Sequence, residues 1–173
     1  VESVMKFFTS RNFAISASDG SVLGYGKSVW AMIDTQSRQP VDIFSINDGL
    51  IKEYVETEKP CPIAKSGRVK VTADAELVRT IDTYYNDVDV NGHINSIKYI
   101  EHVLDLFDID FYKANRLKRL EVAYVAETYQ GDKLSFYREE IAPLEYAIKV
   151  VKIKKETQET IEVCRILMIF VKD

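Results

Sequence analysis

One helical pattern followed by four strand patterns constrains the fold of this chain more than any other feature. From Ile97 to Phe107, apolar residues recur with the spacing of one helix face, and polar residues occupy the other positions. Runs rich in branched and aromatic residues follow at 118–126, 132–141, 146–154 and 160–171. A single helix ahead of consecutive antiparallel strands is typical of an α+β fold, in which one sheet wraps around one helix. We predict this arrangement for the C-terminal part of the chain.

The N-terminal part shows a related but shorter pattern. Two strand-like runs, 4–17 and 21–33, are joined by Asp19-Gly20, a dipeptide that supplies the positive φ angles of a tight hairpin. The spacing of apolar residues then predicts a short helix over 45–55. This order of elements corresponds to the back half of a unit like the C-terminal one. We therefore expect a first unit that is N-terminally incomplete.

Between the two parts lies a stretch without a strand or helix pattern. Residues 58–67 read EKPCPIAKSG and contain two prolines and a glycine, a composition that favours a linker. We predict residues 1–57 as the C-terminal part of a first unit and 68–173 as a second unit. Residues 76–85 fit both strand and helix spacing, and their threonines and tyrosines favour a strand.

Charge and hydropathy argue against several classes of partner. A formal net charge of −4 with 29% charged residues argues against nucleic acid, because phosphate binding requires a net basic face. No apolar run approaches the roughly 20 residues of a membrane-spanning helix, and no signal peptide is visible. We therefore expect no membrane partner and a cytoplasmic location, or else a mature, processed form. Two cysteines are too few for a disulfide framework, and we expect both to be reduced.

The stretch DVDVNGHINSIKY, residues 87–99, concentrates polar side chains directly ahead of the predicted helix. Asp87, Asp89 and Asn91 match three ligand positions of the EF-hand calcium loop. That loop also requires a bidentate carboxylate at its position 12, where this chain has Lys98. The segment that enters the stretch is β-rich, the sequence has no second such loop to pair with it, and four strand patterns follow where an EF-hand protein has helices. The calcium interpretation is therefore disfavoured.

The same stretch also suits the polar part of a hydrolase. A turn leading into a helix places backbone amides and the positive end of the helix dipole where a developing oxyanion is stabilised. His93 can transfer protons near neutral pH, Asp89 or another carboxylate can orient it or activate water, and Asn91 can hold a water or a carbonyl oxygen. Residues 87–95 contain no nucleophilic serine or cysteine. The indicated chemistry is attack by water on an activated ester.

Three segments of the chain carry a family resemblance. In chain order they read SVWAMIDTQSRQPV, DVDVNGHINSIKYIE and EVAYVAETYQGDKL. The second resembles the Asp-x-Asn-x-His-x-Asn core of the acyl-acyl carrier protein (ACP) thioesterases of plant plastids and many bacteria. The third resembles the family's Tyr-x-x-Glu block, and the first is similar to a strand of its first domain. The segments stand in the family's order and together span most of the chain.

The resemblance implies a tandem hot-dog fold, in which each unit is a sheet curled around a long helix. Carried over position by position, the family's functional residues fall on Asp89, Asn91, His93 and Glu127. The implied reaction is hydrolysis of fatty acyl-ACP thioesters, which frees the fatty acid and ends chain elongation. No metal or organic cofactor is implied. Thr128 stands where plant members have a cysteine, so a covalent cysteine route is not available here.

Several alternatives stay open at this point. Either Glu127 or Asp89 could be the general base. A hot-dog acyl-CoA thioesterase and a non-catalytic acyl-binding hot-dog protein are the alternative functions. The expected partners are ACP and its fatty acyl thioester, and homodimerisation through the sheets is the default for the fold. We predict that His102 is solvated on the polar side of the helix. A basic cluster after the helix is a candidate docking patch for acidic ACP, formed by Lys113, Arg116, Lys118 and Arg119.

Overall fold

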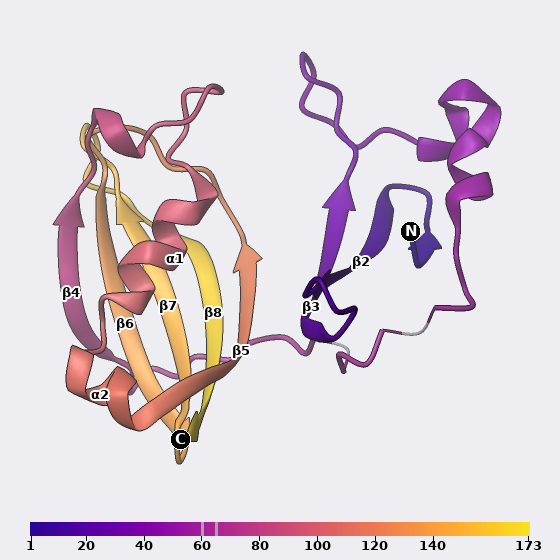
Figure 1. Ribbon diagram of the computed structural model, residues 1–173. Helices are drawn as coiled ribbons and strands as arrows, with labels where there is room; N and C mark the ends of the chain where they lie inside the picture. Colours follow the sequence, from indigo (N-terminus) through magenta and orange to yellow (C-terminus); the bar gives the residue numbers. More distant parts are fainter. Residues whose placement is uncertain (60, 65) are drawn as a thin grey trace. The chain divides into compact units, whose positions relative to one another are not determined.

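The computed structural model describes residues 1–59, 61–64 and 66–173. The chain divides into two compact units, residues 1–65 and 66–173 (Figure 1). The predicted linker, 58–67, includes Pro60 and Lys65, which lie outside the described residues. The roles assigned above to 1–57, 58–67 and 68–173 therefore stay predictions.

The second unit is a five-stranded antiparallel sheet that curls around the helix α1 (Ser96–Leu104) (Figure 1). A single-turn 3-10 segment, η3 (Tyr85–Asp87), precedes α1, and a second short helix, α2 (Ile109–Ala114), follows it. In their order across the sheet, the strands are β4 (Glu76–Asp82), β6 (Lys133–Ala142), β7 (Glu145–Ile153), β8 (Thr160–Lys172) and β5 (Asn115–Tyr124). The strand interpretation of residues 76–85 is confirmed for 76–82.

The core of this unit lies between α1 and the sheet. Tyr99 and Val103 stand four residues apart on one face of α1, and both are buried. They belong to the same cluster of buried side chains as Ile148 of β7 and Ile166 of β8. Each fully buried aliphatic side chain stabilises the fold by about 1.5–3 kcal/mol. This layer holds the loops at the start of α1 and at the end of β5 in place.

The predicted helix is confirmed, but its buried stripe begins after Ile97 and the helix ends before Phe107. Ile97 is 54% exposed and does not belong to the buried stripe. The helix ends at Leu104, and Phe107 enters the core from the connection to α2. An aromatic cluster accounts for this ending, since the Phe107 ring lies 4.8 Å from Phe111 and 5.2 Å from Phe170 between centroids. The sequence analysis missed α2, because six residues are too few to show a helical period.

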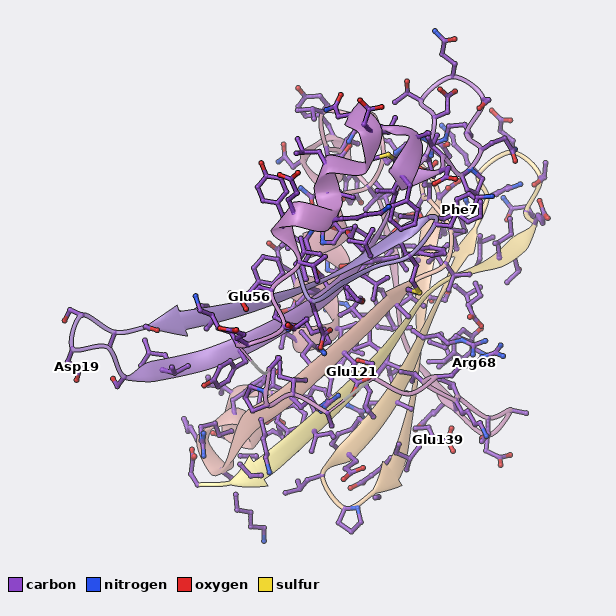
Figure 2. The ribbon with its side chains drawn as sticks, turned by 90° about the vertical axis from the view of Figure 1, so that its right-hand side faces the viewer. Phe7, Asp19, Glu56, Arg68, Glu121 and Glu139 are labelled. Atoms are coloured by element: carbon purple, nitrogen blue, oxygen red, sulfur yellow. The ribbon has the colours of Figure 1, made fainter. Side chains whose placement is uncertain are left out.

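The first unit contains a three-stranded antiparallel sheet in the order β1 (Ser3–Val4), β2 (Phe8–Ser16) and β3 (Val22–Ala31). The hairpin predicted at Asp19 is confirmed, and Figure 2 shows Asp19 at its tip. Gly20 there adopts a φ of 86°, which a glycine reaches without strain. The prediction of a single strand over 4–17 is wrong. The chain reverses between β1 and β2, and these two strands form a second hairpin.

The short helix predicted over 45–55 is confirmed as a helical segment over 47–54, but it is a kinked 3-10 helix rather than an α-helix. Two 3-10 segments occupy this region, η1 (Ile43–Ser45) and η2 (Asn47–Tyr54). Asp48 and Gly49 inside η2 have φ angles of 54° and 75°, which lie in the left-handed region and kink the segment. Apolar spacing predicts a helical face here but cannot detect such a kink.

Candidate active site

Three of the predicted site residues, Asp89, Asn91 and His93, lie in the loop between η3 and α1. The loop closes on itself, because the Asp89 amide donates to the His93 carbonyl at 2.8 Å. Gly92 supplies a φ of 81° at the tip. The backbone around His93 is thereby fixed in a tight turn.

The Asp89 carboxylate is committed to this turn. Its Oδ1 accepts hydrogen bonds from the Asn91 amide at 2.8 Å and from the His93 amide at 3.3 Å. The bond from the Asn91 backbone is the main cause that holds the pKa of Asp89 below its ordinary value. A carboxylate that accepts backbone N–H bonds in this way is a weak base. Asp89 therefore orders the loop that carries His93.

The calcium interpretation finds no support in this loop. The Asp87 carboxylate accepts from the Tyr84 amide at 2.7 Å and closes a capping box on η3. The Lys98 ammonium forms an ion pair with Glu101 at 2.8 Å. Over the described ranges 1–59, 61–64 and 66–173, no group of three or more His, Cys, Asp or Glu side chains could hold a metal ion.

Glu127 reaches the same place from the connection between β5 and β6. Its Oε2 lies 3.3 Å from Nε2 of His93. The side chains of Glu127 and His93 are 43% and 23% exposed, so water and substrate can reach both. The two loops are also joined through the backbone, because the Ile94 amide donates to the Thr128 carbonyl at 2.8 Å. The fold therefore brings an imidazole and a carboxylate together from distant segments, within hydrogen-bond reach of each other.

The two remaining positions, Asn91 and Thr128, differ in their exposure. Asn91 is exposed on the same turn as His93. The Thr128 side chain is fully buried, so its hydroxyl is not accessible to a substrate.

The start of α1 is less open than the sequence suggests. Asn95 caps the helix, and its Oδ1 accepts from the Ile97 amide at 3.0 Å. The Lys98 amide donates to the Asn95 carbonyl at 2.9 Å. The predicted oxyanion role therefore has no support from these two amides.

Two residues of the site escaped the sequence analysis. The Tyr129 hydroxyl donates to Glu127 Oε2 at 3.4 Å, and its ring stands edge-on to the His93 ring with centroids 5.1 Å apart. Lys152 of β7 donates from Nζ to the backbone carbonyl of Glu127. One signal for Lys152 was available, because it stands four residues after Ile148 in the same strand. Side chains at even spacing in a strand point to the same face of the sheet, and Ile148 is buried. A lysine at a core position of a strand indicates a specific polar partner.

The prediction that His102 is solvated is wrong. Its Nδ1 is buried and has no hydrogen-bond partner among the described residues. Its ring meets the Phe136 ring edge-on at 6.1 Å between centroids. Burial lowers the pKa of His102 below its ordinary value of 6.5. Helical spacing placed this residue on the polar side, but the curled sheet reaches around to cover it.

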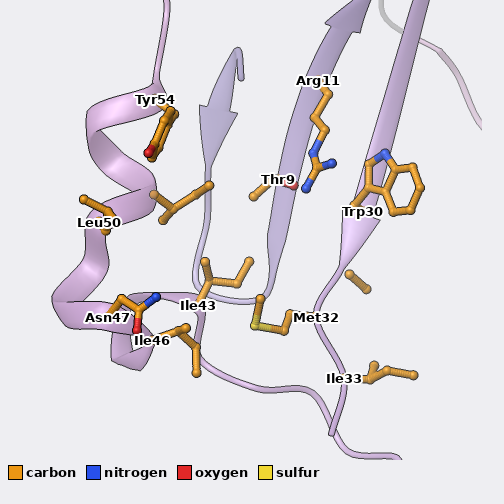
Figure 3. Close-up of a pocket in the computed structure, with 12 residues that line it drawn as sticks. Thr9, Arg11, Trp30, Met32, Ile33, Ile43, Ile46, Asn47, Leu50 and Tyr54 are labelled. Atoms are coloured by element: carbon orange, nitrogen blue, oxygen red, sulfur yellow. The ribbon is translucent and has the colours of Figure 1, made fainter. Parts of the chain in front are cut away.

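The first unit contains a pocket of about 460 Å³ (Figure 3). Trp30, the only tryptophan of the chain, and Arg11 stand on its wall, with the guanidinium 5.1 Å from the centre of the indole ring. The other apolar side chains that line it are Ala31, Met32, Ile33, Ile43, Ile46, Leu50, Ile51 and Tyr54. The lining suits a hydrocarbon chain.

Comparison with solved structures places these features in context. The structure resembles an acyl-ACP thioesterase from Bacteroides thetaiotaomicron with a TM-score of 0.86 and 45% identity, over 98% of this chain and 65% of that one. It resembles the 12:0-ACP thioesterase from Umbellularia californica with a TM-score of 0.79 and 17% identity, over 99% of this chain and 65% of that one. A hotdog-fold thioesterase from Campylobacter jejuni aligns with 59% of this chain and 86% of its own, at 15% identity and a TM-score of 0.50. The predicted hot-dog fold class is confirmed.

Sequence comparison agrees with the structural comparison. The chain is 28% identical over 111 residues to the chloroplastic palmitoyl-acyl carrier protein thioesterase of Arabidopsis thaliana. The match covers 62% of this chain and 27% of that relative, so the chain spans only part of the plant proteins it matches. The family model for the acyl-ACP thioesterase N-terminal domain matches residues 1–54, and the model for the C-terminal domain matches residues 71–168. The chain belongs to the acyl-ACP thioesterase family.

Proposed function

We propose that this chain hydrolyses fatty acyl-ACP thioesters, releases the free fatty acid and thereby ends chain elongation. The observation that carries the proposal is the 3.3 Å contact between His93 Nε2 and Glu127 Oε2, in which both side chains remain accessible. Family membership supports the same reaction class.

In the proposed mechanism, Glu127 is the general base. It takes a proton from a water molecule as the water oxygen attacks the thioester carbonyl carbon. The tetrahedral intermediate then collapses, the carbon–sulfur bond breaks, and His93 helps to pass a proton to the departing thiolate. The products are a fatty acid and the carrier thiol. Attack by water is in keeping with the inaccessible hydroxyl of Thr128.

The two carboxylates take different roles in this proposal. The Asp89 oxygen already accepts two backbone N–H bonds, whereas the Glu127 carboxylate faces a proton-carrying side chain. We therefore assign proton transfer to Glu127 and ordering of the His93 loop to Asp89. Asn91, exposed on that loop, would hold the water or the substrate carbonyl oxygen.

For the acyl chain, we propose the apolar pocket of the first unit as the binding site. Its lining is aliphatic and aromatic apart from Thr9, Arg11 and Asn47. Binding of an acyl chain there requires no metal or organic cofactor, and the absence of a cofactor stays a prediction.

The docking surface for ACP is not assigned to the predicted basic cluster. Three of its four cations already face acidic partners, through the pairs Lys113–Asp110 at 2.8 Å, Arg116–Asp173 at 3.4 Å and Arg119–Glu121 at 2.6 Å. Such pairing lowers the positive potential that an acidic carrier would meet.

Homodimerisation and a cytoplasmic location also stay predictions. Within the described part of the chain, no helix is long and apolar enough to cross a membrane.

Release of free thiol tests the proposed function directly. The purified protein is given palmitoyl-ACP and palmitoyl-CoA at matched concentrations, and a His93→Gln variant controls for contaminating thioesterases. We expect faster release from the ACP thioester. Equal or faster release from the CoA thioester would identify an acyl-CoA thioesterase instead. Binding of acyl chains without any thiol release would identify a non-catalytic acyl-binding protein.

A further inference from the structure

Lys152 is the starting point for a further inference. Its exposure is 5%, and no other lysine or arginine of the described residues is buried to this degree. Burying an ammonium group costs free energy unless polar partners replace its water. The structure gives Lys152 two such partners, the backbone carbonyl of Glu127 and the face of the Tyr129 ring, whose centre lies 5.6 Å from Nζ.

The register of the sheet explains why Lys152 lies beneath this loop. Lys152 pairs with Leu134 at the start of β6, directly after the loop that carries Glu127. Alternation along β7 turns Lys152 to the same side as Val150 and Ile148, which are both fully buried. The ammonium therefore approaches the Glu127 loop from the core side of the sheet.

Tyr129 holds the same loop from the solvent side. Its hydroxyl donates to Glu127 Oε2 at 3.4 Å, and its ring edge packs against His93. The backbone of Tyr129 is itself fixed, because its amide donates to Asp132 Oδ2 at 3.2 Å and its carbonyl accepts from the Thr83 hydroxyl at 3.2 Å. Tyr129 thus links the Lys152 ammonium, the Glu127 carboxylate and the His93 ring.

We propose that Lys152 and Tyr129 are positioning residues that hold the Glu127 carboxylate against His93, Lys152 through the backbone of Glu127 and Tyr129 through its side chain. This inference rests on the proposed function. A glutamate side chain that is 43% exposed has several rotamers available, and a general base must keep one of them. A displacement of about 1 Å in a catalytic group can cost about a hundredfold in rate.

The chain offers a matched control for both residues. Lys149 of the same strand lies 5.1 Å from the centre of the Tyr137 ring, in the same kind of cation–ring contact. Lys149 and Tyr137 are cross-strand partners on β7 and β6 and have no contact with the site residues among their described interactions. The variant Lys149→Met therefore makes the same substitution as Lys152→Met, and Tyr137→Phe the same as Tyr129→Phe, at positions away from Glu127.

The kinetic test compares Tyr129→Phe, Lys152→Met and Lys152→Arg. Tyr129→Phe keeps the ring contacts and removes only the hydroxyl, whereas Lys152→Met keeps the length of the side chain and removes its charge and N–H donors. We expect each to lower kcat by about tenfold with KM unchanged, since the position of Glu127 affects the chemical step rather than substrate binding. Lys152→Arg should recover part of the loss. The double variant should lose less than the product of the single losses, because both act on Glu127.

Stability measurements separate positioning from general support of the fold. Removing a buried ammonium group relieves its desolvation cost, which offsets the loss of its hydrogen bond to the Glu127 carbonyl. We therefore expect Lys152→Met to unfold at the same or a higher denaturant concentration than the wild type while its kcat falls. A kcat loss that is matched by an equal loss in Lys149→Met, or that follows a loss of stability, would overturn the inference.

A second readout does not depend on hydrolysis. The chain has two histidines, so the ring ¹⁵N resonances of His93 can be assigned against those of His102. We expect the His93 resonances of Tyr129→Phe and Lys152→Met to move toward those of Glu127→Gln, and the His102 resonances to stay in place. Unmoved His93 resonances in both variants would overturn the inference. If the wild type released no thiol at all, the proposed function would fail, and this readout would still decide whether the two residues position Glu127.

Discussion

At the residue scale, the two carboxylates of the site differ in what surrounds their oxygens. Asp89 accepts hydrogen bonds from two amides of its own loop, and these bonds lower its pKa. Glu127 instead meets the imidazole of His93 and the hydroxyl of Tyr129. Sequence comparison alone treats the two residues as equivalent acids. In the proposed mechanism, these different hydrogen bonds assign the ordering of the loop to Asp89 and the proton transfer to Glu127.

This division predicts different outcomes for two substitutions of Asp89. Asp89→Asn keeps an oxygen that can accept the Asn91 and His93 amides, and it should keep kcat within about tenfold of wild type, because no general base is lost. Asp89→Ala leaves both amides without their acceptor and should lose more. The measurement is kcat with palmitoyl-ACP for each variant. A loss in Asp89→Asn as large as that of Glu127→Gln would assign the base to Asp89.

The sequence predicted the residue types of the site better than its supporting contacts. His93 and Glu127 were both predicted, and the fold places them within 3.3 Å of each other. Lys152 was not, because its contact with the Glu127 carbonyl joins segments that are distant in the chain. Tyr129 was not either, because nothing in the sequence shows that its hydroxyl turns back toward Glu127, two residues before it. Only the full register of β6 and β7 brings Lys152 beneath the Glu127 loop.

At the element scale, α1 shows how the sheet modifies what helical periodicity predicts. Position in the helix assigned His102 to solvent, but its Nδ1 is buried and has no hydrogen-bond partner within the part of the chain that the structure describes. The apolar stripe also extended past the true end of the helix at Leu104. The period of the apolar residues predicts which face of a helix packs against the sheet. It does not predict how many residues beside that face a curved sheet also covers.

The burial of His102 predicts a pH-dependent stability. Its folded-state pKa is lowered mainly by desolvation, while Asp87, Asp105 and Glu101 raise it and Arg79 lowers it further. Below the ordinary value of 6.5, the unfolded chain binds a proton that the folded chain does not. Stability should therefore fall as the pH drops through 6.5.

The measurement for this prediction is the free energy of unfolding at pH 7.5 and at pH 5.5. We expect the His102→Leu variant to lose less stability between the two values than the wild type. The companion variant His93→Gln measures the contribution of the other histidine. An unchanged pH dependence in His102→Leu would show that burial of this imidazole does not cause the effect.

At the scale of the whole molecule, the broad architecture was predictable and the details of the first unit were not. One helical period followed by four strand periods indicated a sheet around a helix, and the second unit has that arrangement. In the first unit, the reversal before Phe8 and the kink at Asp48 are set by backbone angles and turn contacts that leave no periodic signal. The domain boundaries drawn from composition stay predictions.

The proposed acyl pocket of the first unit gives a binding prediction. Because Trp30 is the only tryptophan and lines the pocket, titration with palmitate should change the intrinsic fluorescence. Leu50→Asp places a charge in the pocket wall and should weaken binding, since an unpaired charge opposes apolar burial. Leu23→Asp, at an exposed position outside the pocket, is the control. Equal affinity in both variants would locate the acyl site elsewhere.

The central claim is that Glu127, held against His93, activates the attacking water. Its most direct test is the single-turnover rate of Glu127→Gln on palmitoyl-ACP, beside the control Glu145→Gln at the opposite end of β7 from Lys152. We expect a fall of about a hundredfold or more in Glu127→Gln with unchanged stability, because a general base is lost and the shape of the side chain is kept. The control should retain the wild-type rate. A near wild-type rate in folded Glu127→Gln would contradict the claim.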